Sequence, residues 1–448
     1  MSDLAAVVAE LMPIVRADLE RLVRIPSVAF PGFPAAPVHE AAQATLEILR
    51  DAGAPAELLE IPGAPPAVWA QVDGPPGAPT VLLYAHYDIQ PAGDEAAWDS
   101  PPFEPTERDG RLYGRGTADD KCGVALHAGT LRAFGGTPPV TVKVVIEGEE
   151  ETGGGSFMDY VAAHPERFAA DVVVVADGGN WKVGEPTLTT TLRGICQIDV
   201  EVRTLEGPVH SGLYGGAVPD ALIALSRVLA SLHDEHGDVA VVGLAGGPWD
   251  GRPVEEEVLR EGARVLEGVD LVGTDSIAAR LYTRPSITAI GIDAPAMEGA
   301  TNAIVPVARA RVSVRLAPTE TDPAAAQRTV MAHLMEHAPW GVQVSCVPGE
   351  IARGAVLAAD GSGAQAARRA LHGAYGKEAV AVGSGGAIPL CVTLAQTLPD
   401  ADIVLWGACD DGARIHAANE SVDLGDLERA TLAQALLLQE LASAAPPA

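Results

Sequence analysis

The feature of the sequence that most limits its fold is a run of short apolar segments that alternate with helix-length segments. The apolar segments are bounded by Gly, Pro and Asp, a pattern typical of strands. They lie at 67–72, 80–85, 140–147, 171–176 and 402–406. Apolar residues at helical spacing predict helices at 4–23, 38–52, 123–134 and 157–163. Strands that alternate with helices imply an α/β layer around a buried sheet.

The alternation changes near position 187 and returns near position 356. The order between them is strand, helix, two strands, helix and strand, as in a small split βαβ sandwich. These elements are predicted at 195–203, 217–236, 286–291, 307–316, 322–337 and 342–348. At 448 residues, two domains are expected. We therefore predict an α/β fold whose outer domain, a mixed sheet flanked by helices at 1–186 and 356–448, is interrupted by a smaller α+β domain at 187–355.

The charge of the chain narrows its possible partners. Lys and Arg number 30 against 60 Asp and Glu, which gives a net charge of −30. Nucleic acid and anionic membrane surfaces would repel such a chain, so we expect neither as a partner. The first 24 residues mix charged with apolar side chains, unlike a signal peptide, and no segment is long and apolar enough to span a bilayer.

The cysteines bear on the location of the protein. They number five, are widely spaced and include no CxxC pair. An odd number at such spacing argues against a disulfide framework and against a structural zinc ribbon. We therefore expect the protein in the reducing cytoplasm.

Possible metal ligands begin at the end of the predicted strand 80–85. In extended chain, His86 and Asp88 point to the same side, because side chains alternate along a strand. A carboxylate beside a ligating histidine can accept its other ring N–H and so fix its tautomer. A histidine that caps a loop at a strand end would give the same pattern.

Two further acidic clusters lie downstream. Asp119 and Asp120 follow two glycines and precede a predicted helix, where Asp is also a favoured capping residue. Glu147 and 149–151 come directly after the strand 140–147. A charge run is usually a solvated face, but carboxylates at the end of a buried strand repel one another unless cations neutralise them.

Asp177 and His416 also lie downstream of predicted strands, at 171–176 and 402–406. In open α/β sheets, sites form outside the carboxyl ends of the strands, so these candidates are expected to converge. Two histidines and three carboxylates suit a pair of Zn²⁺ ions about 3.5–4 Å apart that share a bound water. Mn²⁺ and Co²⁺ accept the same ligands.

Five ordered motifs strengthen this hypothesis, at 98–103, 114–121, 147–153, 192–194 and 209–216. With them the sequence resembles the dinuclear zinc peptidases that include carnosine dipeptidase, aminoacylase and glutamate carboxypeptidase, and it is most similar to the carnosine-dipeptidase branch. The resemblance covers nearly the whole chain. It implies that the outer domain is catalytic and that the inserted domain serves as a lid and dimerisation domain.

The resemblance also implies a role for each candidate ligand. His86 and Asp177 would hold one divalent ion, Glu151 and His416 the other, and Asp119 would bridge the two. Asp88 would be the partner of His86, Glu150 the general base, and the peptide bond between Asp119 and Asp120 would be cis.

Substrate contacts are implied in the same way. His210 would stabilise the oxyanion from the partner subunit of a homodimer, and Arg315 would bind the terminal carboxylate of the substrate. Ser384 and Gly385 match a loop whose backbone contacts the substrate. A loop histidine bonded locally and an arginine in a surface salt bridge are the alternatives for His210 and Arg315.

The expected reaction is metal-dependent hydrolysis of an amide bond in a dipeptide or similar small substrate with a free carboxylate. An N-acyl-amino-acid deacylase would share the metals and the base, and it differs only in what the amine-side pocket accepts. A non-catalytic peptide-binding protein is the third reading. It is opposed by Glu150, since a binding module has no use for a base.

Overall fold

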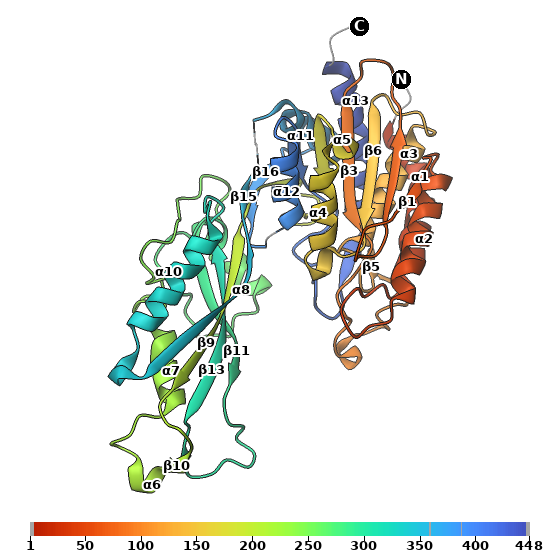
Figure 1. The fold of residues 1–448 in the computed structure, drawn as a ribbon. Coiled ribbons are helices and arrows are strands. Elements are labelled where there is room, and N and C mark those ends of the chain that lie inside the picture. The colour runs from red at the N-terminus through yellow and green to blue at the C-terminus, as the bar shows by residue number, and fades with distance from the viewer. Residues whose placement is uncertain (1–3, 358–359, 387, 445–448) are drawn as a thin grey trace. The chain divides into compact units, whose positions relative to one another are not determined.

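In the computed structural model, which describes residues 4–357, 360–386 and 388–444, the apolar segments form the centre of a mixed sheet (Figure 1). Four adjacent strands are parallel: β6 (Thr141–Glu147), β3 (Thr80–His86), β7 (Val172–Val175) and β17 (Asp402–Leu405). All four residues of β7 are buried valines. A strand covered on both faces reads as a continuous apolar run, which is why sequence alone located these strands.

The remaining strands extend the sheet in the order β1-β2-β6-β3-β7-β17-β8-β15, with β16 also paired to β8. They are β1 (Glu57–Leu59), β2 (Ala67–Val72), β8 (Thr187–Leu192), β15 (Ala355–Val356) and β16 (Val380–Ser384). The pairs β1–β2, β2–β6, β8–β17 and β8–β15 are antiparallel, so the sheet is mixed. The predicted fold class is confirmed.

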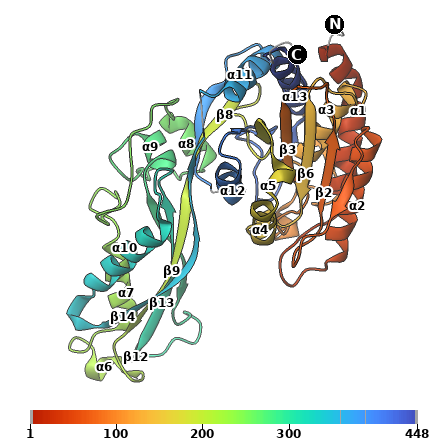
Figure 2. The same ribbon diagram turned by 45° about the horizontal axis from the view of Figure 1, so that its top comes forward.

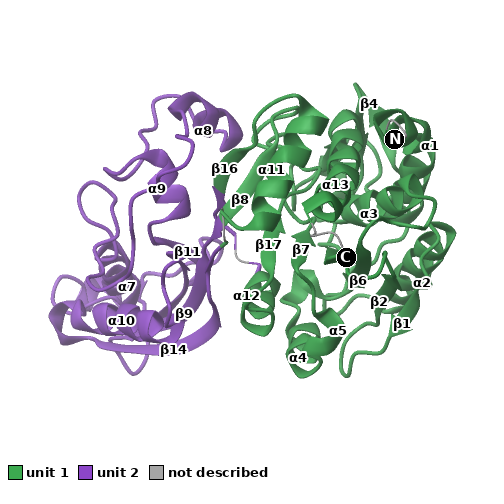
Figure 3. Ribbon diagram, turned by 90° about the horizontal axis from the view of Figure 1, so that it is seen from above, with its two compact units in different colours: residues 1–190, 357–382, 389–448 green, residues 191–356, 383–388 purple. Residues whose placement is uncertain are grey.

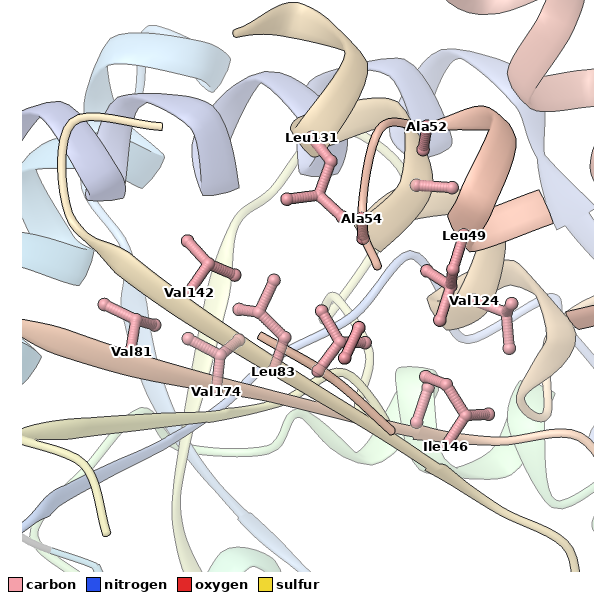
Figure 4. Close-up of a cluster of buried hydrophobic side chains, with 14 of the residues drawn as sticks. Leu49, Ala52, Ala54, Val81, Leu83, Val124, Leu131, Val142, Ile146 and Val174 are labelled. Atoms are coloured by element: carbon pink, nitrogen blue, oxygen red, sulfur yellow. The ribbon is translucent and has the colours of Figure 1, made fainter. Parts of the chain in front are cut away.

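One face of this sheet carries the main hydrophobic core. Leu83, Val142 and Val174 point from the strands toward Leu49 and Leu131 of the covering helices (Figure 4). The helices of this layer are α1 (Leu4–Val23), α2 (Ala36–Asp51), α3 (Lys121–Ala133), α11 (Ser362–Tyr375) and α13 (Leu424–Ala444). Burial of these aliphatic side chains holds the strand ends, and hence the site, in fixed positions.

Aromatic side chains fill part of the opposite face. Trp69 alternates with Val68 and Ala70 of the main core, so it points to the other side of the sheet. Its ring packs edge-on against Phe168, 5.6 Å between centroids. The helices on this side are α4 (Gly155–Ala163), α5 (Pro165–Phe168) and α12 (Pro389–Thr397) (Figure 1).

A second unit is built on an antiparallel sheet with the order β11-β13-β9-β14. Its strands are β9 (Gly194–Arg203), β11 (Ser286–Asp293), β13 (Val307–Leu316) and β14 (Gln343–Ala352). Helices α7 (Ala221–Ala230) and α10 (Pro323–Glu336) cover one face (Figure 2). Residues along β9 alternate between buried and partly exposed, as expected for a sheet with one covered face.

The helix predicted at 217–236 is shorter in the structure, so the predicted bounds were wrong. It begins only after Asp220, whose carboxylate accepts hydrogen bonds from the main-chain N–H groups of Leu222 and Ile223. It ends at Ala230, and Asp234 then accepts N–H groups from its own turn. Both aspartates compete with helix continuation by local hydrogen bonding. Further elements of the unit are α6 (Ser211–Tyr214), α8 (Glu256–Gly262), α9 (Ile277–Tyr282), β10 (Val209–His210), β12 (Ala303–Ile304) and a 3₁₀ helix at Pro339–Gly341.

A small third sheet links segments that are distant in sequence. Strand β18 (Ser421–Asp423) pairs with β5 (Arg111–Tyr113), which pairs with β4 (Thr106–Arg108). The loop before β18 carries His416, and the loop after β5 carries Asp119. Pairing of the strands therefore brings these two loops together.

The chain divides into two compact units (Figure 3). Thr191–Val356 and Gly383–Ile388 form unit 2, and the other described residues form unit 1. The segment Gly383–Ile388 lies in the C-terminal part that the sequence assigned to the outer domain. None of the described helices is both long and apolar enough to cross a membrane.

Candidate metal centre

The parallel strands of unit 1 deliver several acidic and imidazole groups to one edge of the sheet. His86 is the last residue of β3, and Asp177 follows β7 by two positions. Glu150 and Glu151 lie in a short 3₁₀ turn just after β6. Because the carboxyl ends of parallel strands share one edge, these side chains converge there.

Asp119 lies between the two histidines. Its Oδ1 is 2.9 Å from Nε2 of His86, and its Oδ2 is 2.9 Å from Nε2 of His416. The peptide bond from Asp119 to Asp120 is cis, as the resemblance implied. Asp120 itself caps α3 by accepting the N–H of Gly123, which was the alternative reading for this residue. A carboxylate with each oxygen facing a different imidazole is placed to bridge two cations.

The candidate ligands form two groups that share Asp119. One contains His86, Asp119 and Asp177, and the other contains Asp119, Glu151 and His416. Within each group the ligand atoms lie within 4.8 Å of one another. Two imidazole nitrogens and three carboxylates in this arrangement fit two divalent ions, such as Zn²⁺, with positions left for water.

The environment of His86 supports ligation through Nε2. Its Nδ1 lies 3.1 Å from the main-chain oxygen of Asp88, which can only accept a hydrogen bond, so Nδ1 carries the proton. The carboxylate of Asp88 is 3.4 Å from the same nitrogen. It also accepts the main-chain N–H groups of Glu150 and Glu151, at 3.2 and 3.1 Å. Asp88 therefore orients both a candidate ligand and the turn that carries the candidate base.

Gln90, which was not identified from the sequence, fixes the carboxylate of Glu151. Its main-chain N–H donates to one oxygen of Glu151 at 3.0 Å, and its Nε2 donates to the other at 2.7 Å. Glu151 also lies 3.3 Å from Nε2 of His416. A ligand held at both oxygens keeps its orientation before a cation binds.

Glu420 is a second residue that sequence reasoning missed. Its buried carboxylate accepts the main-chain N–H groups of Gly116, Ala118 and Asp119 at 3.0, 3.0 and 3.2 Å. The guanidinium of Arg115, only 1% exposed, pairs with its other oxygen. This contact ties the loop of His416 to the loop of Asp119. The signal available in the sequence was an acidic residue just after the His416 loop, with no indication of its distant partners.

Replacing Glu420 with Ala should therefore lower the affinity for metal by about 10- to 100-fold, as loss of a group that orients metal ligands does elsewhere. The reason is that three N–H groups and the Arg115 guanidinium lose their buried acceptor. Titration of metal-free protein with Zn²⁺ would measure this. Glu440→Ala, which breaks a surface pair with Arg369, is the control and should bind metal normally. Unchanged affinity in the Glu420 variant would contradict the role given to this clamp.

Burial and mutual repulsion raise the pKa values of several carboxyl groups in the cluster. Burial raises the pKa of Asp177 well above its usual value, and the charges of Asp119 and Glu150 raise it further. Burial also raises the pKa of Glu150 to about 7, with His86 opposing the shift and Asp119 adding to it. Bound cations would reverse such shifts, because they stabilise the ionised carboxylates. Two divalent ions bound here would therefore relieve the repulsion among these carboxyl groups.

The other sequence candidates belong to unit 2. His210, on β10, is exposed, and its Nδ1 accepts the N–H of Gly212 at 3.0 Å. Arg315 is partly buried on β13, and among the described residues no acidic side chain pairs with it, so the salt-bridge alternative finds no partner there. The hydroxyl of Ser384 accepts the N–H of Gly386 at 3.1 Å.

The sequence matches the Peptidase family M20/M25/M40 over residues 82–440. The chain belongs to this family. It is 44% identical over 372 residues to cysteinylglycine-S-conjugate dipeptidase of Corynebacterium striatum, in an alignment that covers 81% of each chain. It is 30% identical over 382 residues to Beta-Ala-His dipeptidase of Rattus norvegicus, covering 80% of this chain and 76% of the relative.

The fold agrees with this membership. Human carnosine dipeptidase 1 superposes with a TM-score of 0.84 over 98% of each chain, at 24% identity. Dug1p of Saccharomyces cerevisiae gives the same TM-score over 99% of this chain and 98% of its own, at 22% identity. The predicted likeness to the carnosine-dipeptidase branch is confirmed, and the chain is a dinuclear metallopeptidase.

Proposed function

We propose that this metallopeptidase hydrolyses dipeptides that carry a free carboxylate, with Zn²⁺ as the metal in both positions. The observation that carries the proposal is the pair of ligand groups that share Asp119, with Glu150 beside them. The relatives named as dipeptidases for cysteinylglycine conjugates and for Beta-Ala-His support a dipeptide as the substrate.

In the proposed reaction, the two ligand groups that share Asp119 would hold the metal ions, which when bound would lower the pKa of a water molecule and polarise the scissile carbonyl. Glu150 accepts the proton of that water at a carboxylate oxygen and then donates it to the nitrogen of the leaving amine. The carboxylate of Asp88 accepts the main-chain N–H of Glu150, and this bond fixes the position of the proposed base relative to the candidate ligands.

His210 is proposed to donate a hydrogen bond to the oxyanion. Its Nδ1 accepts the N–H of Gly212, so in the neutral ring Nε2 carries the proton. Among the described residues Nε2 has no acceptor, and the side chain is exposed. The ring is therefore held in the tautomer that an oxyanion donor requires.

The geometry of unit 2 supports a partner subunit as the source of this donor. Arg315 lies near the end of β13 that pairs with Gly194, whereas His210 lies beyond the other end, where Val307 pairs with Arg203. Strand β9 has 10 residues. At about 3.3 Å per residue it spans about 30 Å, and a dipeptide spans about 7 Å. His210 and Arg315 of one chain therefore cannot both contact one dipeptide, so we propose a homodimer with composite sites through the inserted domain.

Mixing two inactive variants tests the composite site. His210→Ala and Glu150→Gln should each be inactive alone, but a mixed dimer has one site with an intact base and an intact donor. With random subunit exchange, about a quarter of the wild-type activity should return. A tagged pair of wild-type chains would verify exchange. If exchange occurs without recovery, His210 acts within its own chain or outside catalysis.

A turnover screen tests the proposed function itself. Dipeptides and N-acyl amino acids should be compared with Zn²⁺ or Mn²⁺ added, before and after chelation. We expect turnover of dipeptides, about two metal ions per active chain, and no activity after exhaustive chelation. Hydrolysis of N-acyl amino acids alone would make the enzyme a deacylase, and no hydrolysis by metal-loaded protein would favour a binding protein.

We also propose the cytoplasm as the location of the enzyme. All five cysteines are free in the structure, and four of them are buried. Thiols persist in a reducing compartment, where disulfides are rare.

A further inference from the structure

Arg193 is a buried cation without a buried anion. It joins β8 to β9 and is 8% exposed. Nε donates to the main-chain oxygen of Gly385 at 3.3 Å, and Nη1 donates to the main-chain oxygen of Arg280 at 3.3 Å and to Oγ of Ser286 at 3.0 Å. Within the described parts of the chain it forms no ion pair. A buried guanidinium with only neutral acceptors is costly unless an anion completes its surroundings.

A second arginine without an ion pair to any described residue lies next to it. Arg315 stands opposite Ile195 on β9 and opposite Ser286 on β11, the residue whose hydroxyl accepts from Arg193. Burial, together with the charge of Arg315, lowers the pKa of Arg193 to about 10. The two guanidinium groups, which both lie beside Ser286, therefore repel one another.

Other arginines on the same strand as Arg315 do have acidic partners. Farther along β13, Arg311 forms a bidentate ion pair with Asp199, and Arg309 forms an ion pair with Glu201. The chain has twice as many acidic as basic residues, 60 against 30. Two neighbouring arginines without an acidic partner in the described part of such a chain are placed to receive a carboxylate from outside, and guanidinium groups match carboxylates geometrically.

Arg193 also holds the Ser384-Gly385 segment in place. Its main-chain N–H donates to the oxygen of Ser384 at 3.3 Å, in addition to the bond from Nε to Gly385. A Cβ on Gly385 would lie 3.0 Å from Nη2 of Arg193, so the backbone approaches the guanidinium closely. These bonds attach Ser384 and Gly385 to Arg193 within unit 2.

From these contacts we infer that Arg193 is a specificity-determining residue, which together with Arg315 forms a two-arginine site for the terminal carboxylate of the substrate. Arg193 supplies positive charge and fixes the backbone of Ser384 and Gly385 beside that carboxylate. This inference rests on the proposed function, because it assumes a substrate with a free carboxylate.

The test compares Cys-Gly with Cys-Gly amide as substrates of the metal-loaded enzyme. Arg193→Met should raise KM for Cys-Gly by about 10- to 100-fold, the range of one or two lost charge-assisted bonds, with little change in kcat. It should hardly alter KM for the amide, so discrimination between the two substrates falls. Arg193→Lys should recover part of the loss, because it restores the charge but not the contacts to Gly385 and Ser286.

Arg311→Met is the matched control, since it removes one positive charge from the same unit and should keep both KM values. Thermal stability and metal content are measured for every variant, because a purely structural defect would lower kcat for both substrates equally. Such an equal loss, or an Arg193→Met enzyme that retains full discrimination, would overturn the inference. Should Arg193→Met fail to fold, Arg193→Lys is compared with wild type instead. Reduced discrimination between the two substrates would support the inference, and full discrimination would overturn it.

Failure of the proposed function gives a different result. If wild-type enzyme cleaves the amide as well as the free dipeptide, the carboxylate is not recognised, and both the role of Arg315 and this inference fall. If Arg315→Met loses discrimination while the Arg193 variants keep it, only the inference about Arg193 falls.

Discussion

Replacing Glu150 with Gln should lower kcat by about 10²–10⁴-fold while the enzyme keeps both metal ions. Gln has the size of Glu but cannot accept the proton of the attacking water. The main-chain N–H of residue 150 would still donate to Asp88, so the turn and its neighbouring ligand should stay in place. Steady-state kinetics and elemental analysis of the same preparation measure the two effects.

The flanking glutamates provide the controls. Glu149 bonds the main-chain N–H of Phe157 at 2.7 Å instead of facing the cluster, so Glu149→Gln should retain most of the activity and all of the metal. Glu151→Gln should lose metal, because Glu151 belongs to one of the two ligand groups. If the variants at positions 149 or 151 showed the behaviour expected of position 150, the assignment of the base would be off by one residue.

Asp119→Ala is expected to abolish binding of both metal ions and to reduce turnover to the background rate. Asp119 is the only residue that belongs to both ligand groups found among the described residues, and its two oxygens face different histidines. His416→Ala should lose less metal than Asp119→Ala, because the group that contains His86 and Asp177 stays complete. Metal content after dialysis, measured for both variants, tests the difference.

The adjacent Asp120 offers a matched control. It caps α3, and Asn caps helices as well as Asp does, so Asp120→Asn should retain both ions. A folded Asp119→Ala protein that still binds two equivalents of metal would contradict the bridging role. Circular dichroism of each variant establishes that the protein is folded before metal is counted.

The sequence predicted the centre of the sheet well because strands that are buried on both faces appear as continuous apolar runs. The valines of β7 and the apolar residues of β3 are covered on both faces, and such runs are visible without any tertiary information. The helix at 217–236 was overestimated, since capping by Asp220 and turn formation by Asp234 depend on side-chain geometry that periodicity does not report.

The same contrast holds for the candidate site. The candidate ligands were predicted because each follows a strand end or a glycine-rich turn, and the topology rule brings such ends together. Glu420 and Arg193 were not found. Arg115 and Glu420 are 305 positions apart, and Arg193 and Gly385 are 192 apart. No local pattern indicates which of the many acidic or basic residues in a chain will meet over such separations.

The sequence by itself determined the class of fold and the types of residue at the metal centre, because hydrophobic period and strand-end position are local properties. Only the tertiary structure decided which oxygen of Asp119 faces which histidine and that Glu420 holds the Asp119 loop. It also decided that Arg193 and Arg315 both lie beside Ser286, with no acidic partner among the residues that the structure describes. These arrangements depend on the packing of segments far apart in the chain, and such packing is set by the whole core.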